Sequence, residues 1–179
     1  MKILVRYGDL MLKGKNKKMF INKLVSHVKI KFTDLETSIN NKHDQLILSF
    51  DDKLLNEVEN RLMQIPGIHS YSIIYEVEKD VVTVVTKAVE LLNETLDDKE
   101  YRFKIETKRA DKEFKYTSLE FTKKVAPLIL KNSNKKLDVD VKNPEVILHI
   151  NIRQDTIYLY LTSKKALGGF PAKVAGKGL

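Results

Sequence analysis

The hydrophobic positions of this chain recur with two spacings, and the spacing changes from segment to segment. Apolar residues at every second position indicate half-buried strands, whereas apolar residues three and four apart indicate one face of a helix. Over the first 77 residues this predicts strand, helix, strand, strand, helix and strand, at residues 3–7, 17–31, 37–40, 45–50, 51–65 and 68–77. That order is the split βαβ arrangement of a ferredoxin-like fold, so we predict a first domain at residues 1–77.

The helix predicted at residues 17–31 has one apolar face and begins in a basic segment. Asn16 is its expected N-cap, and the apolar face consists of Phe20, Ile21, Leu24, Val25 and Val28. The lysines around its start are Lys13, Lys15, Lys17 and Lys18. Cations at this end oppose the helix dipole, and a bound anion among them would offset that cost. A solvated polar surface is the alternative.

A second set of elements follows residue 77. Asp80 is expected to cap a helix that runs to about Leu92, although its β-branched residues leave a strand at 81–85 as the alternative. Pro127 should kink or break a later helix. The remaining pattern predicts a strand from residue 103, a strand at 137–141, a hairpin of 145–153 and 156–161, and a glycine-rich loop or linker at 162–179.

Residues 103–124 place a cluster of cations between the end of a strand and the start of a helix. Thr117 and Glu120 have the spacing of a capping box, which predicts the helix start. Cations beside a helix N-terminus are suited to holding phosphate. Phe114 and Tyr116, in the loop, are the aromatic residues best placed to stack on unpaired bases. An ordinary solvated loop is the alternative.

Charge and composition narrow the classes of function. The net charge of +8 is uneven: residues 1–50 hold 10 basic against 4 acidic residues, residues 51–100 hold 5 against 12, and residues 101–179 hold 17 against 8. Two basic blocks favour a polyanionic partner, foremost a nucleic acid. The chain has no cysteine, which excludes disulfides and thiolate catalysis within it. We recognise neither a signal peptide nor a membrane-spanning run.

We find no catalytic constellation in the sequence. Metal ligation is not expected because the histidines are far apart, at His27, His43, His69 and His149. Neither a GxSxG nor a Walker A motif is present, and the acidic cluster at residues 97–100 has no recognisable partner. The residues therefore favour a binding module over an enzyme.

Several motifs together resemble one family. RYGDLMLKGKNKKMFINKL, at residues 6–24, is similar to the opening of bacterial tRNA 4-thiouridine synthetases, the tRNA sulfurtransferases that also serve thiamine biosynthesis. FKIETKRADKEFKYTS, at residues 103–118, resembles the THUMP segment of that family, and IPGI, VDVKNPEVILHINIR and GGFPAKVAGKGL add support. Asp9 and Lys17 stand where the family usually has Glu and Arg, and Pro127 is unexpected in its helix.

The resemblance implies a mixed α/β fold: a ferredoxin-like domain at 1–77, a THUMP domain at 78–165 and a glycine-rich linker at 166–179. It implies that this portion binds tRNA at the acceptor stem and 3′ end. In the family a catalytic domain follows, which binds ATP and Mg and uses sulfur from a cysteine desulfurase to make 4-thiouridine at position 8. A cytoplasmic location and a possible homodimer are also implied, and this chain alone is expected to have no catalysis, metal or cofactor.

We expect the RNA contacts to be made to phosphates by clustered cations, at Lys13, Lys15, Lys17, Lys18, Lys104, Lys108, Arg109, Lys112, Lys115, Lys123, Lys124, Lys164 and Lys165. Three alternatives stay open. The chain could act on RNA by itself, serve as the RNA-binding adaptor of another THUMP-containing enzyme, or be a protein-interaction module. In the last case its basic blocks would meet the acidic residues 51–100 of another subunit.

Overall fold

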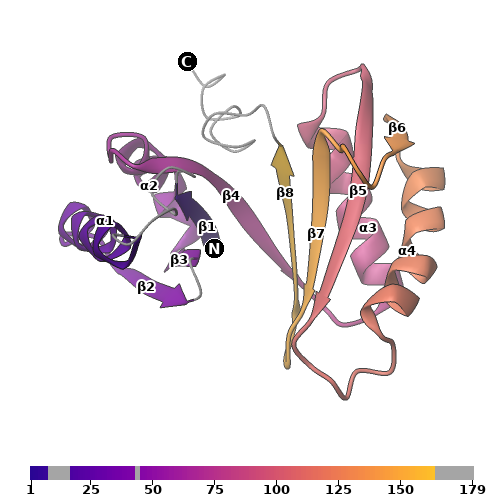
Figure 1. Cartoon of the computed structure of the whole chain (residues 1–179), viewed down its shortest axis with the longest axis horizontal. Helices are drawn as coiled ribbons and strands as arrows, with labels where there is room; N and C mark the ends of the chain where they lie inside the picture. The colour runs from indigo at the N-terminus through magenta and orange to yellow at the C-terminus, as the bar shows by residue number, and fades with distance from the viewer. Residues whose placement is uncertain (8–16, 43–44, 164–179) are drawn as a thin grey trace. The chain divides into compact units, whose positions relative to one another are not determined.

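The computed structural model describes residues 1–7, 17–42 and 45–163, and the chain divides into two compact units. The first unit contains residues 1–74 and the second contains residues 75–163 of the described chain. Strand β4 (Ile68–Val77) belongs to both, because its residues up to Ile74 lie in the first unit and those from Tyr75 lie in the second. Figure 1 shows the elements of each unit.

The first unit is an antiparallel sheet with helices on one side. Its strands lie in the order β2-β3-β1-β4, so β3 separates β1 from β2. The elements are β1 (Lys2–Tyr7), α1 (Lys17–Lys31), β2 (Thr37–Lys42), β3 (Gln45–Phe50), a 3₁₀ turn η2 (Asp52–Leu54), α2 (Leu55–Leu62) and the start of β4. This is the split βαβ arrangement, and the predicted fold class is confirmed.

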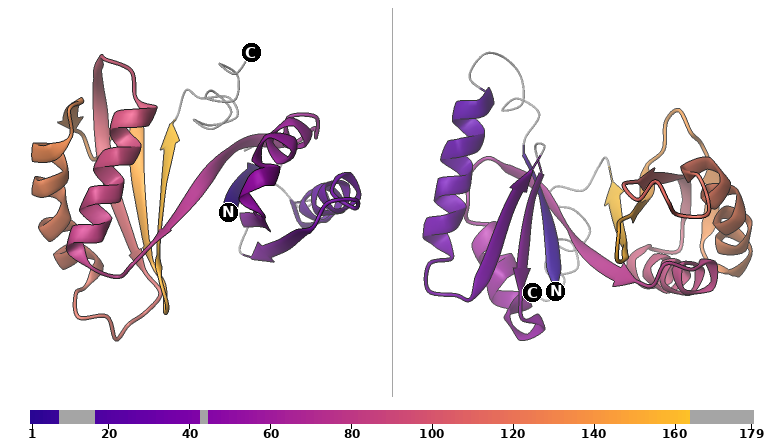
Figure 2. Two further views of the ribbon diagram at one scale, coloured as in Figure 1. Left: turned by 180° about the vertical axis from the view of Figure 1, so that it is seen from behind. Right: turned by 90° about the horizontal axis from the view of Figure 1, so that it is seen from below.

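The core of the first unit lies between the sheet and its two helices (Figure 2). Ile21, Leu24, Val25 and Val28 of α1 are buried, as the apolar spacing predicts, but Phe20 is 41% exposed. The prediction for Phe20 is wrong because, at 100° per residue, it lies about 90° from the centre of the buried face.

The second helix of this unit begins later than the sequence suggests. Asp51 caps the 3₁₀ turn by accepting a hydrogen bond from the Lys53 amide, and α2 starts only at Leu55. Inside the unit, the Tyr71 hydroxyl donates to Glu59 Oε2 at 3.0 Å. Burial raises the pKa of the Glu59 carboxyl, and the Tyr71 hydrogen bond opposes that rise.

The second unit is a mixed sheet in the order β4-β8-β7-β5-β6. Strand β5 (Glu100–Arg109) runs parallel to both β7 (Val146–Ile152) and β6 (Lys136–Val139). Strand β8 (Ile157–Ser163) is antiparallel to β7 and to the end of β4. The predicted loop starting at residue 162 is therefore wrong for its first two residues, because Thr162 and Ser163 continue the pairing with β7.

Helices α3 (Val81–Thr95) and α4 (Ser118–Asn132) cover one face of this sheet (Figure 1). The alternative of a strand at 81–85 is wrong: the Asp80 carboxylate caps a helix there by accepting the Thr83 amide at 2.7 Å. Helix α4 continues through Pro127, so the predicted break is also wrong. The proline is exposed, while Phe121, Val125 and Ile129 fix the other side of the helix in the core. Among the described helices none is both long and apolar enough to span a membrane.

Candidate nucleic-acid interface

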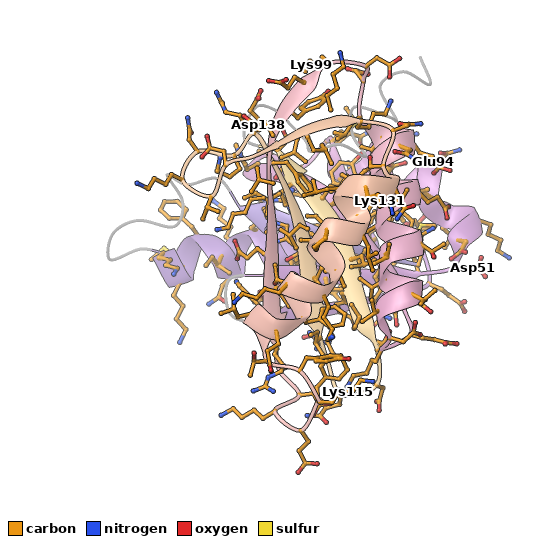
Figure 3. The ribbon with its side chains drawn as sticks, turned by 90° about the vertical axis from the view of Figure 1, so that its right-hand side faces the viewer. Asp51, Glu94, Lys99, Lys115, Lys131 and Asp138 are labelled. Atoms are coloured by element: carbon orange, nitrogen blue, oxygen red, sulfur yellow. The ribbon has the colours of Figure 1, made fainter. Side chains whose placement is uncertain are left out.

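Three connections of the second unit gather at one end of its sheet, where β5 runs into α4 (Figure 1). They are the β4–α3 connection, the β7–β8 turn and the segment of residues 108–117, which we name the basic loop. Lys115 marks this end in Figure 3, whereas Lys99 and Asp138 lie at the opposite end of the same unit. The cations predicted between residues 108 and 124 therefore lie around a single edge.

The basic loop is attached to the end of β7 by its backbone. The amide of Ala110 donates to the Ile152 carbonyl at 2.8 Å, and the amide of Asp111 donates to the same oxygen at 3.4 Å. Asp111 is only 9% exposed, and one of its oxygens accepts the Glu113 amide at 3.0 Å. Its other oxygen pairs with Lys79 Nζ, from the β4–α3 connection, at 2.5 Å. The Lys79 ammonium and the Glu113 amide hold the pKa of the Asp111 carboxyl below its usual value.

Side chains alternate between the two faces of β5, so neighbouring cations lie on opposite faces of the sheet. Thr107 faces the helices, where its hydroxyl meets that of Thr122 at 2.7 Å. Arg109 lies on the same face of β5 as Thr107. Its Nη1 donates to the carbonyls of Phe114 and Tyr116 at 3.4 and 3.2 Å. Arg109 thus supports the loop from within, a role that its sequence position does not reveal.

Lys104 and Lys108 lie on the other face of β5 with Glu106 between them. Their ammonium groups are 3.6 and 3.7 Å from the Glu106 carboxylate, contacts that contribute little at a surface. Lys108, the first residue of the basic loop, is 69% exposed. Lys104 lies earlier on β5, about 13 Å from Lys108 along the strand at about 3.3 Å per residue.

Aromatic rings form the base of the loop. Phe114, Tyr116 and Phe121 contact one another with centroids 5.6 to 6.0 Å apart. Lys115 and Lys124 both place their ammonium groups over the Tyr116 ring, at 5.2 and 5.3 Å. Phe114 and Tyr116 are half-buried in this cluster, so they pack the loop rather than stand free for bases.

Helix α4 starts at the loop with the predicted capping box. The Glu120 amide donates to Thr117 Oγ1 at 3.1 Å, and the Thr117 amide donates to Glu120 Oε1 at 2.8 Å. The Thr117 amide, followed by the Thr117 side chain, lowers the pKa of the Glu120 carboxyl. The exposed cations at this end are Lys108, Lys112, Lys115, Lys123 and Lys124, and they outnumber the exposed carboxylates Glu113, Glu120 and Asp155.

The remaining predicted cations lie in the first unit or outside the residues that the structure describes. Lys17 and Lys18 lie in the first turn of α1, in the first unit. Lys13, Lys15, Lys164 and Lys165 lie outside the residues that the structure describes. Sequence reasoning missed Lys79, since nothing local signals a contact between positions 32 residues apart. Within the described ranges, no group of three or more His, Asp and Glu side chains is arranged to hold a metal.

Two family profiles match consecutive parts of the chain. The profile of the ThiI ferredoxin-like domain matches residues 2–72, and that of the THUMP domain matches residues 78–162. Residues 2–72 belong to the ThiI ferredoxin-like domain family, and residues 78–162 belong to the THUMP domain family. The ferredoxin-like and THUMP assignments made from the sequence motifs are thereby confirmed.

Named relatives agree with this assignment. Probable tRNA sulfurtransferases of Acholeplasma laidlawii and Staphylococcus saprophyticus are 40% and 37% identical to this ThiI-type chain, over 177 and 179 residues. Both matches cover 99% of the chain but only 42% and 43% of the relative, so the chain spans less than half their length. A solved 4-thiouridine synthetase–RNA complex with bound ATP is 27% identical, with a TM-score of 0.63, over 89% of this chain and 40% of that one.

Proposed function

We propose that this chain is the tRNA-binding portion of a tRNA sulfurtransferase and that the basic loop of its THUMP domain contacts the RNA backbone. The observation that carries the proposal is the basic loop, whose exposed lysines are held on a folded base of ring contacts and hydrogen bonds. The solved structure similar to this chain is a complex with RNA, which supports the same partner.

The chemistry of the loop favours recognition of shape and backbone. Lysine ammonium groups are point charges that suit phosphate oxygens, whereas base edges are read by bidentate side chains. Arg109, the one guanidinium in the loop, donates through Nη1 to two of the loop's own carbonyls. We therefore propose contacts to the tRNA backbone, and we place them at the acceptor stem and 3′ end because the family resemblance implies that region.

In the whole enzyme, this portion would present tRNA to an ATP- and Mg-dependent catalytic domain that makes 4-thiouridine at position 8. A cysteine desulfurase would supply the sulfur, in the cytoplasm, and the enzyme could act as a homodimer. On this proposal the residues of this chain supply binding and orientation, and they take no part in the bond-breaking steps.

The test is tRNA binding across a salt series, with intact tRNA and with tRNA that lacks its 3′-terminal nucleotides. We expect affinity to fall steeply with salt, by about 0.7–0.9 in the log–log slope for each phosphate contact. Removal of the 3′-terminal nucleotides from the tRNA should also weaken binding. Equal binding of both RNAs would refute 3′-end recognition, and absence of binding at low salt would favour the protein-interaction module.

A further inference from the structure

Lys79 connects all three chain segments at the basic end of the second unit. It belongs to the β4–α3 connection, one residue before the Asp80 cap of α3. Its ammonium pairs with Asp111 in the basic loop at 2.5 Å and donates to the Gln154 carbonyl in the β7–β8 turn at 3.0 Å. The same ammonium lies 5.2 Å from the centroid of the Phe114 ring.

The charge of Lys79 is directed inward. The side chains of Lys79 and Asp111 are 17% and 12% exposed, in contrast to 69% for Lys108. The Asp111 carboxylate and the Gln154 carbonyl use two of the three N–H donors of the Lys79 ammonium, which leaves one donor on a side chain that is only 17% exposed. Asp111 is similarly occupied, since it also accepts the Glu113 amide that shapes the loop's turn.

We propose that Lys79 is a positioning residue of the RNA site: its ion pair with Asp111 holds the basic loop in its binding conformation before RNA arrives. The inference rests on the proposed RNA-binding function. A loop fixed in advance loses little conformational entropy when RNA binds, whereas a loosened loop must be ordered at that moment. Lys79 thereby acts on affinity through Lys108, Lys112 and Lys115, without touching the RNA.

A positioning role of Lys79 and a direct phosphate contact by Lys79 predict different results for two variants. A phosphate contact made by Lys79 would disappear in Lys79→Met, and the log–log salt slope would fall by about 0.7–0.9. A positioning residue leaves that slope unchanged and lowers affinity at every salt concentration. Asp111→Asn removes a negative charge from a basic surface, so simple electrostatics predicts tighter binding, whereas loss of positioning predicts weaker binding.

The experiment measures binding of fluorescently labelled tRNA to the 179-residue chain, with thermal unfolding as a check on folding. We expect Lys79→Met and Asp111→Asn each to weaken binding about tenfold with an unchanged salt slope, the cost of ordering roughly one more backbone residue on binding. Lys79→Arg keeps a cation for Asp111 and should bind nearly as wild type. Lys99→Met, at the opposite end of the unit, is the matched control and should bind as wild type.

Other outcomes distinguish failure of the positioning role of Lys79 from failure of the proposed tRNA-binding function. If Lys108→Gln weakens binding but Lys79→Met and Asp111→Asn do not, the positioning role is refuted and the proposed function stands. Tighter binding by Asp111→Asn, or a lower slope for Lys79→Met, would also refute positioning. Should Lys79→Met fail to fold, the nearly isosteric Asp111→Asn carries the test. A wild-type chain that binds no tRNA would refute both proposals.

Discussion

Lys108 and Arg109 are adjacent cations that should give opposite signatures when neutralised. Lys108 is 69% exposed and only approaches Glu106 at 3.7 Å, so Lys108→Gln should change stability by less than about 0.5 kcal/mol. Its effect should be on tRNA binding, where the loss of one phosphate contact lowers the log–log salt slope by about 0.7–0.9.

Arg109→Gln should act mainly on stability. The guanidinium donates to two loop carbonyls at 3.2 and 3.4 Å, and a hydrogen bond contributes about 0.5–1.5 kcal/mol. Because both distances are long, we expect a loss of about 1–2 kcal/mol in total. For a unit of this size, that lowers the unfolding midpoint by roughly 4–16 °C.

Calorimetry and tRNA titrations in a salt series measure the two quantities on the same samples. The reasoning is refuted if Lys108→Gln destabilises the chain as much as Arg109→Gln does. It is equally refuted if Arg109→Gln leaves the unfolding midpoint unchanged while lowering the salt slope, because Arg109 would then be a phosphate contact.

Three further predictions concern the scaffold. Thr117→Ala removes the capping hydroxyl and should cost about 1 kcal/mol in thermal unfolding, whereas Leu119→Ala, at an exposed position in the same turn, should cost less. Phe121→Ala removes a fully buried ring that supports the loop and should cost about 3–5 kcal/mol in urea unfolding; a loss below 1 kcal/mol would contradict this packing. Glu59→Gln tests the raised pKa of Glu59: protonation favours the folded state, so wild-type stability from this group declines as pH rises above 4.5 and through the raised value. The stability of Glu59→Gln relative to wild type should therefore increase between pH 4 and pH 7, and a constant difference would refute the assignment.

Local signals explain what could be predicted from the sequence. The capping box of Thr117 and Glu120 and the Asp80 cap join side chains to amides within three residues, so their spacing in sequence is sufficient. The apolar spacing likewise predicted most elements. Phe20 was misassigned because spacing alone does not locate the edge of a buried face.

Contacts between distant segments explain what could not be predicted. The pair of Lys79 and Asp111 exists only because β4, β5 and β7 end at the same edge of one sheet. The inward role of Arg109 depends on which face of β5 meets the helices, and nothing in the charge pattern states this. Charge clustering singled out the loop between β5 and α4, but it did not separate the cations that support the loop from those that face outward.

The pairing of β5 with β7 also has a consequence for the order of events during synthesis. These parallel strands bring together positions such as Arg102 and Glu145, 43 residues apart, and such non-local pairing forms slowly. The Ile152 carbonyl that anchors the basic loop and the Gln154 carbonyl that holds Lys79 both follow the loop in the chain, by roughly 40 residues. A nascent chain of which only the residues up to 117 have left the ribosome thus carries all the lysines of the loop without the scaffold that arranges them. On this basis, ordered RNA contact should begin only after the β7–β8 turn has left the ribosome.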